Sequence, residues 1–400
     1  MLSPARPLRL LTLCCGLALA FVGSGASLAA QEPSAPQTPS PDQLQSAVSR
    51  LGELDYASRA AASRTIRRTP APQVVPALLR AVEEHIDGYV RYRALVLLTG
   101  FNDPRTKDAM VESLVSPNDR LRAVAYSYFE RNPDPQVAPR LLGALDTEGA
   151  EFVRPALVRA LAALSAVPAV RPVLIRETTR GEDFFRSAVI EAMGDHKAQF
   201  AFDALVPIAR LDGPLVADTA LAIGKLGDPR GVAVLSDLLQ SASKAVQPFV
   251  AAGICLLGVN CASHETFLVD TLAFADKNLG HQEALRASAA GLSALAVSGR
   301  GSSLKALFEI GIDSRDPTRA PVSLAVATVA LRNAPLMLDA LSKSAQGAGA
   351  IKLVAEGFDM LEEDLEKERF FAVVRKTYWA SPEGSPQREL MRTLISQLDF

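Results

Sequence analysis

The sequence is poor in aromatic residues, cysteine and histidine, and its charges nearly cancel. Of 400 residues, 6% are aromatic, and there are four Cys and four His. The 42 Lys and Arg against 44 Asp and Glu give a formal charge of −2, which excludes a strongly basic nucleic-acid binder and a disordered acidic chain. Few aromatics beside 48% apolar residues indicate a core of Ala, Leu and Val, which suits packed helices better than sheets.

Residues 1–30 have the layout of a secretory signal peptide. Arg6 and Arg9 precede an apolar run over residues 10–22, and small residues follow it. The pattern predicts an exported protein, periplasmic or secreted, with no integral membrane span after signal cleavage. A retained anchor and a lipoprotein signal are the alternatives, although 13 apolar residues are short for a span of about 20. Cleavage would change the formal charge from −2 to −4.

Composition divides the rest of the chain into three segments. A stretch rich in Pro, Ser and Gln predicts a flexible tether over residues 31–50. Paired Ala- and Leu-rich helical patterns fill residues 51–348. Residues 349–400 are more highly charged and contain the single Trp.

A position with a small side chain recurs through the helical segment at intervals of 31 to 38 residues. A period in the low thirties with two helices per unit predicts an all-α fold, a right-handed α-solenoid of about nine helix pairs. Where helices of adjacent repeats cross, a small side chain lets the backbones approach closely. The recurring position is occupied by Ala60, Ala94, Ala125, Ala156, Ala188, Ala220, Ala251, Ala289 and Ala325.

The best-formed unit runs from Val216 to Gln240. Its first helix is predicted to end at Gly227, because glycine tolerates the left-handed conformation of a helix C-terminus. Asp228 then caps the second helix through its side-chain oxygen, and Pro229 follows at a position where no amide donor is needed.

This unit resembles the HEAT-like repeat of the phycobilisome-lyase type, in which a Leu-Gly-Asp-Pro turn joins two short helices. The resemblance covers roughly residues 54–345 and implies a helical solenoid, whereas the functions of the family range from bilin attachment to regulation and scaffolding. The residues that carry it are Leu226 to Pro229 with Ala220, and in weaker copies Asn102 to Pro104 with Ala94 and Met193 to Asp195 with Ala188.

The segment 349–400 is predicted to form a C-terminal helical cap of two or three helices, since terminal repeats need a polar outer face. We expect its acidic cluster at residues 362–368 to be a solvated surface. The aromatic residues that follow are expected to pack inside the cap, with an aromatic binding box as the alternative. They are Phe370, Phe371, Tyr378 and Trp379.

The sequence contains no phosphate-binding loop, zinc-protease helix, nucleophile elbow or Cys-x-x-Cys pair. One branch of HEAT-like proteins, resembling deoxyhypusine hydroxylase, holds di-iron with several His-Glu dipeptides. Only His264-Glu265 forms that dipeptide here, and one turn cannot supply a di-iron site. We therefore expect no catalytic residue, no metal and no cofactor.

Cys255 and Cys261 are the two cysteines outside the signal segment. In an exported protein, cysteines six residues apart can close a small loop. One hypothesis is a disulfide that replaces the missing Asp-Pro turn of this repeat. The other is a buried Cys255 that packs like alanine, with Cys261 free.

These observations favour an exported, non-enzymatic scaffold, monomeric and without nucleic-acid partners. Its second helices would form a concave surface for a protein or peptide of unknown identity. Alternatives are a repeat-based enzyme, such as a lyase working in a groove between repeats, and a structural component that self-associates through its cap. Candidate contact residues, chosen as polar residues between apolar positions of the second helices, are Lys107, Arg140, Arg176 and Asp203.

Overall fold

The protein is described by a computed structural model over residues 38–400, a stretch that contains 22 α-helices and no strand. The helices alternate between two layers. The first helices of the repeats are α2 (Tyr56–Arg68), α4 (Gly88–Leu98), α6 (Asp119–Arg131), α8 (Arg154–Ala163), α10 (Asp183–Asp195), α12 (Val216–Leu226), α14 (Gln247–Leu256), α16 (Gln282–Val297), α18 (Arg319–Arg332) and α20 (Gly347–Met360).

The second helices follow the first ones in the outer layer. They are α3 (Ala71–Glu84), α5 (Arg105–Ser113), α7 (Ala138–Leu145), α9 (Val170–Glu177), α11 (Phe202–Ala209), α13 (Gly231–Ser241), α15 (Cys261–Lys277), α17 (Gly301–Gly311) and α19 (Ala334–Lys343). The chain begins with α1 (Pro41–Arg50) and ends with α21 (Asp364–Ala380) and α22 (Pro386–Gln397), and short 3-10 turns are η1 (Thr99–Phe101), η2 (Pro135–Val137), η3 (Gln199–Ala201) and η4 (Leu279–His281).

The predicted all-α solenoid is confirmed. Each of the nine recurring alanines lies in a first helix, from α2 to α18, and a second helix follows each time. Seven of the nine are buried, while Ala60 and Ala156 are half-buried. Neighbouring first helices pack directly against one another along the chain, so the small side chains lie where the repeats meet.

Two glycines lie at a close helix crossing, which the alanine pattern did not predict. Gly224 on α12 faces Gly253 on α14, and a Cβ atom on Gly224 would lie 2.4 Å from the Gly253 Cα atom. No side chain fits there, because the obstacle is backbone that cannot rotate away.

Replacing Gly224 with alanine should therefore lower the free energy of unfolding by about 1–3 kcal/mol, the usual cost of overpacking. Gly143 on α7 is the matched control, because nothing lies within 4 Å of its Cβ position. There the same substitution should raise stability by about 0.5–1 kcal/mol through helix propensity. Denaturant titration followed by circular dichroism measures both. A Gly224→Ala protein as stable as the control would contradict the crossing.

The turn after α12 has the predicted glycine conformation, although α13 begins at Gly231 with Arg230, and not Asp228, at its N-cap position. Gly227 adopts φ +72°, in the left-handed region. The Asp228 side chain accepts a hydrogen bond from the Arg230 backbone amide at 2.9 Å. Asp103 and Asp134 accept equivalent bonds from the backbone amides of Arg105 and Gln136. The same hydrogen bond therefore occurs in three turns between first and second helices.

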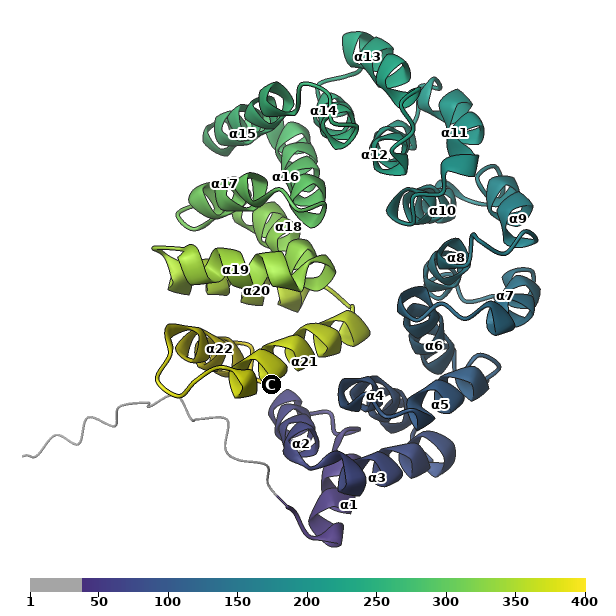
Figure 1. Cartoon of the computed structure of the whole chain (residues 1–400), viewed down its shortest axis with the longest axis vertical. Helices are drawn as coiled ribbons and strands as arrows, with labels where there is room; N and C mark the ends of the chain where they lie inside the picture. The colour runs from purple at the N-terminus through teal and green to yellow at the C-terminus, as the bar shows by residue number, and fades with distance from the viewer. Residues whose placement is uncertain (1–37) are drawn as a thin grey trace, which may run out of the picture.

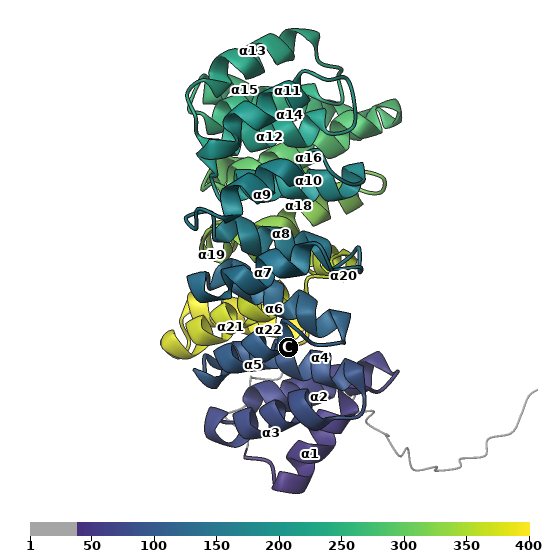
Figure 2. The ribbon, with the colours of Figure 1, turned by 90° about the vertical axis from the view of Figure 1, so that its right-hand side faces the viewer.

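The solenoid closes on itself, a curvature that the repeat pattern does not specify. Figure 1 shows a ring in which α21 lies beside the helices of the N-terminal repeats. α21 packs against α4, η1 and α6, across more than two hundred residues of sequence. Seen from the side, most helices cross the ring from one edge to the other (Figure 2).

Both ends of the repeat segment differ from expectation. Residues 41–50 form α1, with Leu44, Ala47 and Val48 buried, so the predicted tether over residues 31–50 is too long. The apolar positions at spacing three and four dictate this helix, and the Ser40 side chain caps it. The proposed signal segment and the earlier part of the tether lie outside the described residues.

The C-terminal segment forms three helices, but its acidic cluster is not a solvated face. α20 continues the row of first helices against α18, and α21 bridges to the other end of the chain. Glu366 and Glu368 are 5% and 1% exposed, which contradicts the solvated surface. Phe370 and Tyr378 are buried as expected, whereas Trp379 is 50% exposed.

Within residues 38–400, no single helix is long and apolar enough to cross a membrane. The bent pair α18 and α19 reaches the required length and composition only together, with 119° between the two helices.

Candidate functional site

The first helices line the inside of the ring, and the second helices lie outside (Figure 1). The prediction that second helices form the concave surface is therefore wrong. Both layers are amphipathic, and a first helix touches its neighbours on two sides, so its burial pattern alone does not reveal which layer faces inward. We call the inward surface formed by the first helices, from α4 to α18, the inner face.

The four predicted contact residues are exposed but lie in the outer layer. Lys107 pairs with Asp134 at 2.7 Å, and the Arg140 guanidinium donates to the Val111 carbonyl oxygen at 3.3 Å. These contacts join neighbouring outer elements.

The other two predicted residues make the same kind of contact. Arg176 lies 3.6 Å from Asp146 of the preceding repeat, and Asp203 pairs with Arg230 at 2.9 Å. All four side chains therefore link successive repeats on the outside of the ring, and a role in partner binding stays a prediction.

The ring is closed by ion pairs between α21 and three successive first helices. The Asp364 carboxylate accepts hydrogen bonds from Arg93 at 2.6 Å and from the Tyr92 hydroxyl at 2.5 Å. Burial would raise the pKa of Asp364, but Arg93 and the Tyr92 hydroxyl outweigh it and lower the pKa. The same burial, together with Asp364, raises the pKa of Tyr92.

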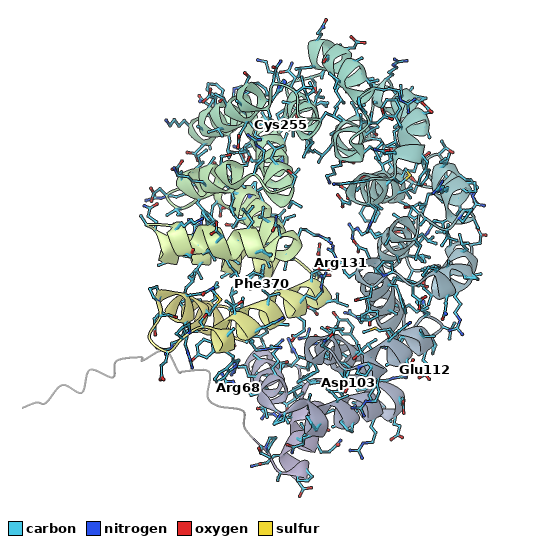
Figure 3. All side chains as sticks on the ribbon, viewed as in Figure 1. Arg68, Asp103, Glu112, Arg131, Cys255 and Phe370 are labelled. Carbon is cyan, nitrogen blue, oxygen red and sulfur yellow. A yellow bond between two sulfur atoms is a disulfide. The ribbon has the colours of Figure 1, made fainter. Side chains whose placement is uncertain are left out.

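Two further carboxylates continue the closure. Glu366 accepts from Arg131 of α6 at 3.1 Å, and Arg131 lies on the inner side of the ring (Figure 3). Glu368 pairs with Arg67 of α2 at 2.7 Å and with Arg375 at 3.3 Å. Three acidic side chains of one helix thus meet three arginines from α2, α4 and α6.

The closure also has an apolar part. Leu365 is buried and belongs to the core cluster of the N-terminal half, whereas Phe370, Val374 and Tyr378 of α21 belong to the C-terminal cluster. The Arg67 guanidinium stands 5.3 Å from the centre of the Phe371 ring. Arg64 pairs with Asp399 beyond α22.

A cavity of about 460 Å³ opens on the inner face, between α4, α6 and α8 on one side and residues 361–367 on the other. The exposed Arg120 guanidinium lies over the rings of Tyr89 and Tyr92, at 5.8 and 5.6 Å from their centres. Arg159 and Arg332 also line the space. Such a surface offers hydrogen-bond donors, acceptors and aromatic faces together.

Glu130 is the buried acid of this cavity, at 8% exposure. Its carboxylate lies 3.6 Å from the His196 imidazole and 3.8 Å from the Arg332 guanidinium. Burial by itself would raise the pKa of Glu130, but His196, Arg131 and Arg332 outweigh it and hold the pKa at about 2. The charge of Glu130 therefore helps to hold α18 against α6 across the ring.

Cys255 and Cys261 are joined in the structure by a disulfide that connects the end of α14 to the first residue of α15. The bond spans the turn in which the Asp-Pro pair is missing.

We expect the purified protein to contain this bond. Intact mass under non-reducing conditions should be lower than after reduction by two hydrogen atoms, and alkylation without reduction should leave Cys255 and Cys261 unmodified. Modification of both thiols in the unreduced protein would overturn the assignment.

The His264-Glu265 dipeptide has a packing role in the structure. Glu265 accepts hydrogen bonds from Arg300, Ser302 and Ser303, at 2.9, 2.6 and 2.6 Å, which connect α15 to α17. Burial would raise the pKa of Glu265, but these three donors lower it. In residues 38–400, no group of three or more His, Cys, Asp and Glu side chains could hold a metal ion.

Tyr89, Tyr92 and Arg120 of the inner face were missed at the sequence level. They lie near the beginning of first helices, whereas we expected the second helices to carry the contact surface. The available signal was the spacing of Tyr89 and Tyr92, which place both rings on one face of α4.

The HEAT repeats family model matches residues 44–130 and 83–162. No curated protein matches the sequence. Solved structures similar to this chain include yeast importin-β (Kap95p), with 14% identity, 92% of this chain covered and a TM-score of 0.40. A β-catenin chain is 12% identical, the match covers 93% of this chain and 94% of that chain, and the TM-score is 0.29. UNC-45 from Drosophila melanogaster is 12% identical, the match covers 88% of this chain and 62% of that chain, and the TM-score is 0.23.

This chain spans 58% of the length of the importin-β chain. The phycobilisome-lyase subtype of the repeat is not confirmed. Residues 44–162 match HEAT repeats, and helix pairs of the same kind continue the stack around the ring, so the chain has a HEAT/armadillo-like repeat fold.

Proposed function

We propose that this protein is a non-enzymatic HEAT-repeat scaffold that holds a protein or peptide segment on the inner face of its ring. The observation that carries the proposal is the cavity of about 460 Å³ with Tyr89, Tyr92 and Arg120 at its surface. Tyrosine and arginine contribute much of the energy in protein interfaces, because they offer large contact area and polar groups together. Stacked repeats add a regular array of side chains for an extended partner.

Export is part of the proposal. It rests on the order of charged, apolar and small residues over 1–30, and a disulfide such as Cys255–Cys261 persists in oxidising compartments. N-terminal sequencing of protein from fractionated cells should find a chain that begins after Ala29 or Ala30. A full-length chain in the cytoplasm would contradict export.

In-cell crosslinking followed by mass spectrometry tests the inner face. An inner variant, Tyr89→Ala with Arg120→Glu, is compared with an outer variant, Lys107→Glu with Arg140→Glu. We expect the inner variant to lose crosslinked partners that the wild type and the outer variant retain. Loss in the outer variant alone would show that the second helices carry the interaction, and identical partners in all three would overturn the proposal.

A further inference from the structure

Large apolar side chains are exposed at one type of loop in this ring. They occupy the loops that enter the first helices α2, α4, α6, α8 and α12, and the second residue of α10. Each is between 60% and 99% exposed. We call this row of six residues the apolar rim: Leu54, Ile86, Val115, Phe152, Phe184 and Leu211.

The opposite loops lack this feature. Among the described residues, the loops that leave α2, α4, α6, α8, α10 and α12 toward the second helices hold no large apolar side chain in the exposed class. Successive first helices run in the same direction across the ring, so the loops that enter them lie along one edge (Figure 2). Leu279, 68% exposed in η4 before α16, repeats the feature farther along the chain.

One exposed apolar side chain needs no explanation, but six of them at repeat spacing along one edge form a row that a partner could contact. The packing of the repeats does not require exposed apolar residues, so it does not explain why they lie on one edge at repeat spacing. The residues that pack the repeats together are the buried ones beside them, such as Val90, Val153 and Phe185. The rim side chains are thus available for contacts outside the chain.

Acidic residues alternate with the apolar ones. Leu54 lies between Glu53 and Asp55, and Glu151 precedes Phe152. The six loops that enter α2 to α12 contain eight Asp or Glu and only two Arg, whereas the six loops that leave the same helices contain three acidic and two basic residues. The loops of the apolar rim therefore contain a larger excess of acidic residues than the loops of the opposite edge.

We propose that the apolar rim docks a protein or peptide segment that combines apolar side chains with Lys and Arg. The exposed carboxylates of Glu151, Glu182 and Asp212, which lie within two residues of Phe152, Phe184 and Leu211, would pair with such cations and orient the partner. An anionic lipid surface is disfavoured, because the exposed carboxylates of Glu151, Glu182 and Asp212 would repel its headgroups. The inference rests on the proposed scaffold function and adds a second surface, with a partner chemistry, to the inner face.

The probe is a fluorescent amphipathic helical peptide made of Leu and Lys, titrated with the full chain by anisotropy. The rim variant carries Ile86→Ser, Phe152→Ser and Phe184→Ser. The control variant carries Phe274→Ser, Val373→Ser and Trp379→Ser, which remove exposed apolar residues elsewhere. We expect the rim variant to bind about tenfold or more weakly, since each side chain loses apolar contact area. The control should bind like the wild type.

Equal weakening in both variants would overturn the proposal, as would equal binding of a peptide made of Leu and Glu. Binding of wild type to anionic vesicles but not to the peptide would instead indicate a membrane surface. A wild-type dimer by sedimentation that the rim variant breaks would show that the rim contacts a second copy. If only the inner variant Tyr89→Ala with Arg120→Glu loses the peptide, the rim assignment fails and the scaffold function stands.

Discussion

Replacing Glu368 with alanine is expected to lower the free energy of unfolding by about 3–5 kcal/mol, the cost of leaving a buried charge without its partner. Glu368 is 1% exposed, and it pairs with Arg67 of α2 at 2.7 Å and with Arg375 at 3.3 Å. Without the Glu368 carboxylate, the Arg67 guanidinium would remain buried, with 7% of its side chain exposed, and would have lost its acidic partner. Thermal and denaturant midpoints measure the loss.

Opening of the ring should accompany this loss, because α21 is the element that joins the two ends of the solenoid. Small-angle scattering should report a larger radius of gyration for Glu368→Ala than for the wild type. Glu362 is the matched control, since it belongs to the same acidic cluster but is exposed. Glu362→Ala should change neither stability nor shape, and an equal effect of both substitutions would refute a specific role for the buried pair.

Acid should weaken the contact across the ring through Glu130. Its pKa is about 2 in the folded chain against an ordinary value of 4.5, so the folded state favours the carboxylate. A lowered pKa adds stability that is fully present above about pH 4.5 and is lost as the pH falls toward 2. The difference corresponds to about 3 kcal/mol.

The variant Glu130→Gln isolates this contribution, because amide and carboxyl groups have similar shapes and only one of them titrates here. We expect the difference in free energy of unfolding between wild type and Glu130→Gln to decrease toward zero at acid pH. Denaturant titration from pH 6 downward measures this difference. Other carboxylates with lowered pKa values, including Asp364 and Glu265, affect both proteins equally and cancel. A difference that stays constant with pH would mean that Glu130 does not titrate as described.

The repeat and its turns were predictable because their causes are local. Gly227 is followed by a capping aspartate within one turn, and Ala220 recurs at repeat spacing. The close approach of Gly224 and Gly253 was not predictable, since it depends on how two helices from different repeats cross.

The surface assignments failed for a related reason. Lys107 and Arg140 are polar residues on amphipathic helices, and amphipathicity reveals which side of a helix is buried but not which layer faces inward. Glu366 and Glu368 were predicted to be solvated because they belong to an acidic cluster in a segment expected to form the polar outer face of a terminal cap. Their partners, Arg67 and Arg131, are more than two hundred residues away.

The sequence by itself determined the helical repeat, its turns and the small side chains at the repeat contacts, because each depends on residues within about one repeat of one another. The tertiary structure decided the curvature of the stack, the layer that faces inward and the meeting of α21 with α2, α4 and α6. Curvature accumulates from a small rotation at every repeat, so no local pattern encodes where the chain ends meet. The acidic residues of α21 can pair with arginines of α2, α4 and α6 only when the two ends of the stack meet.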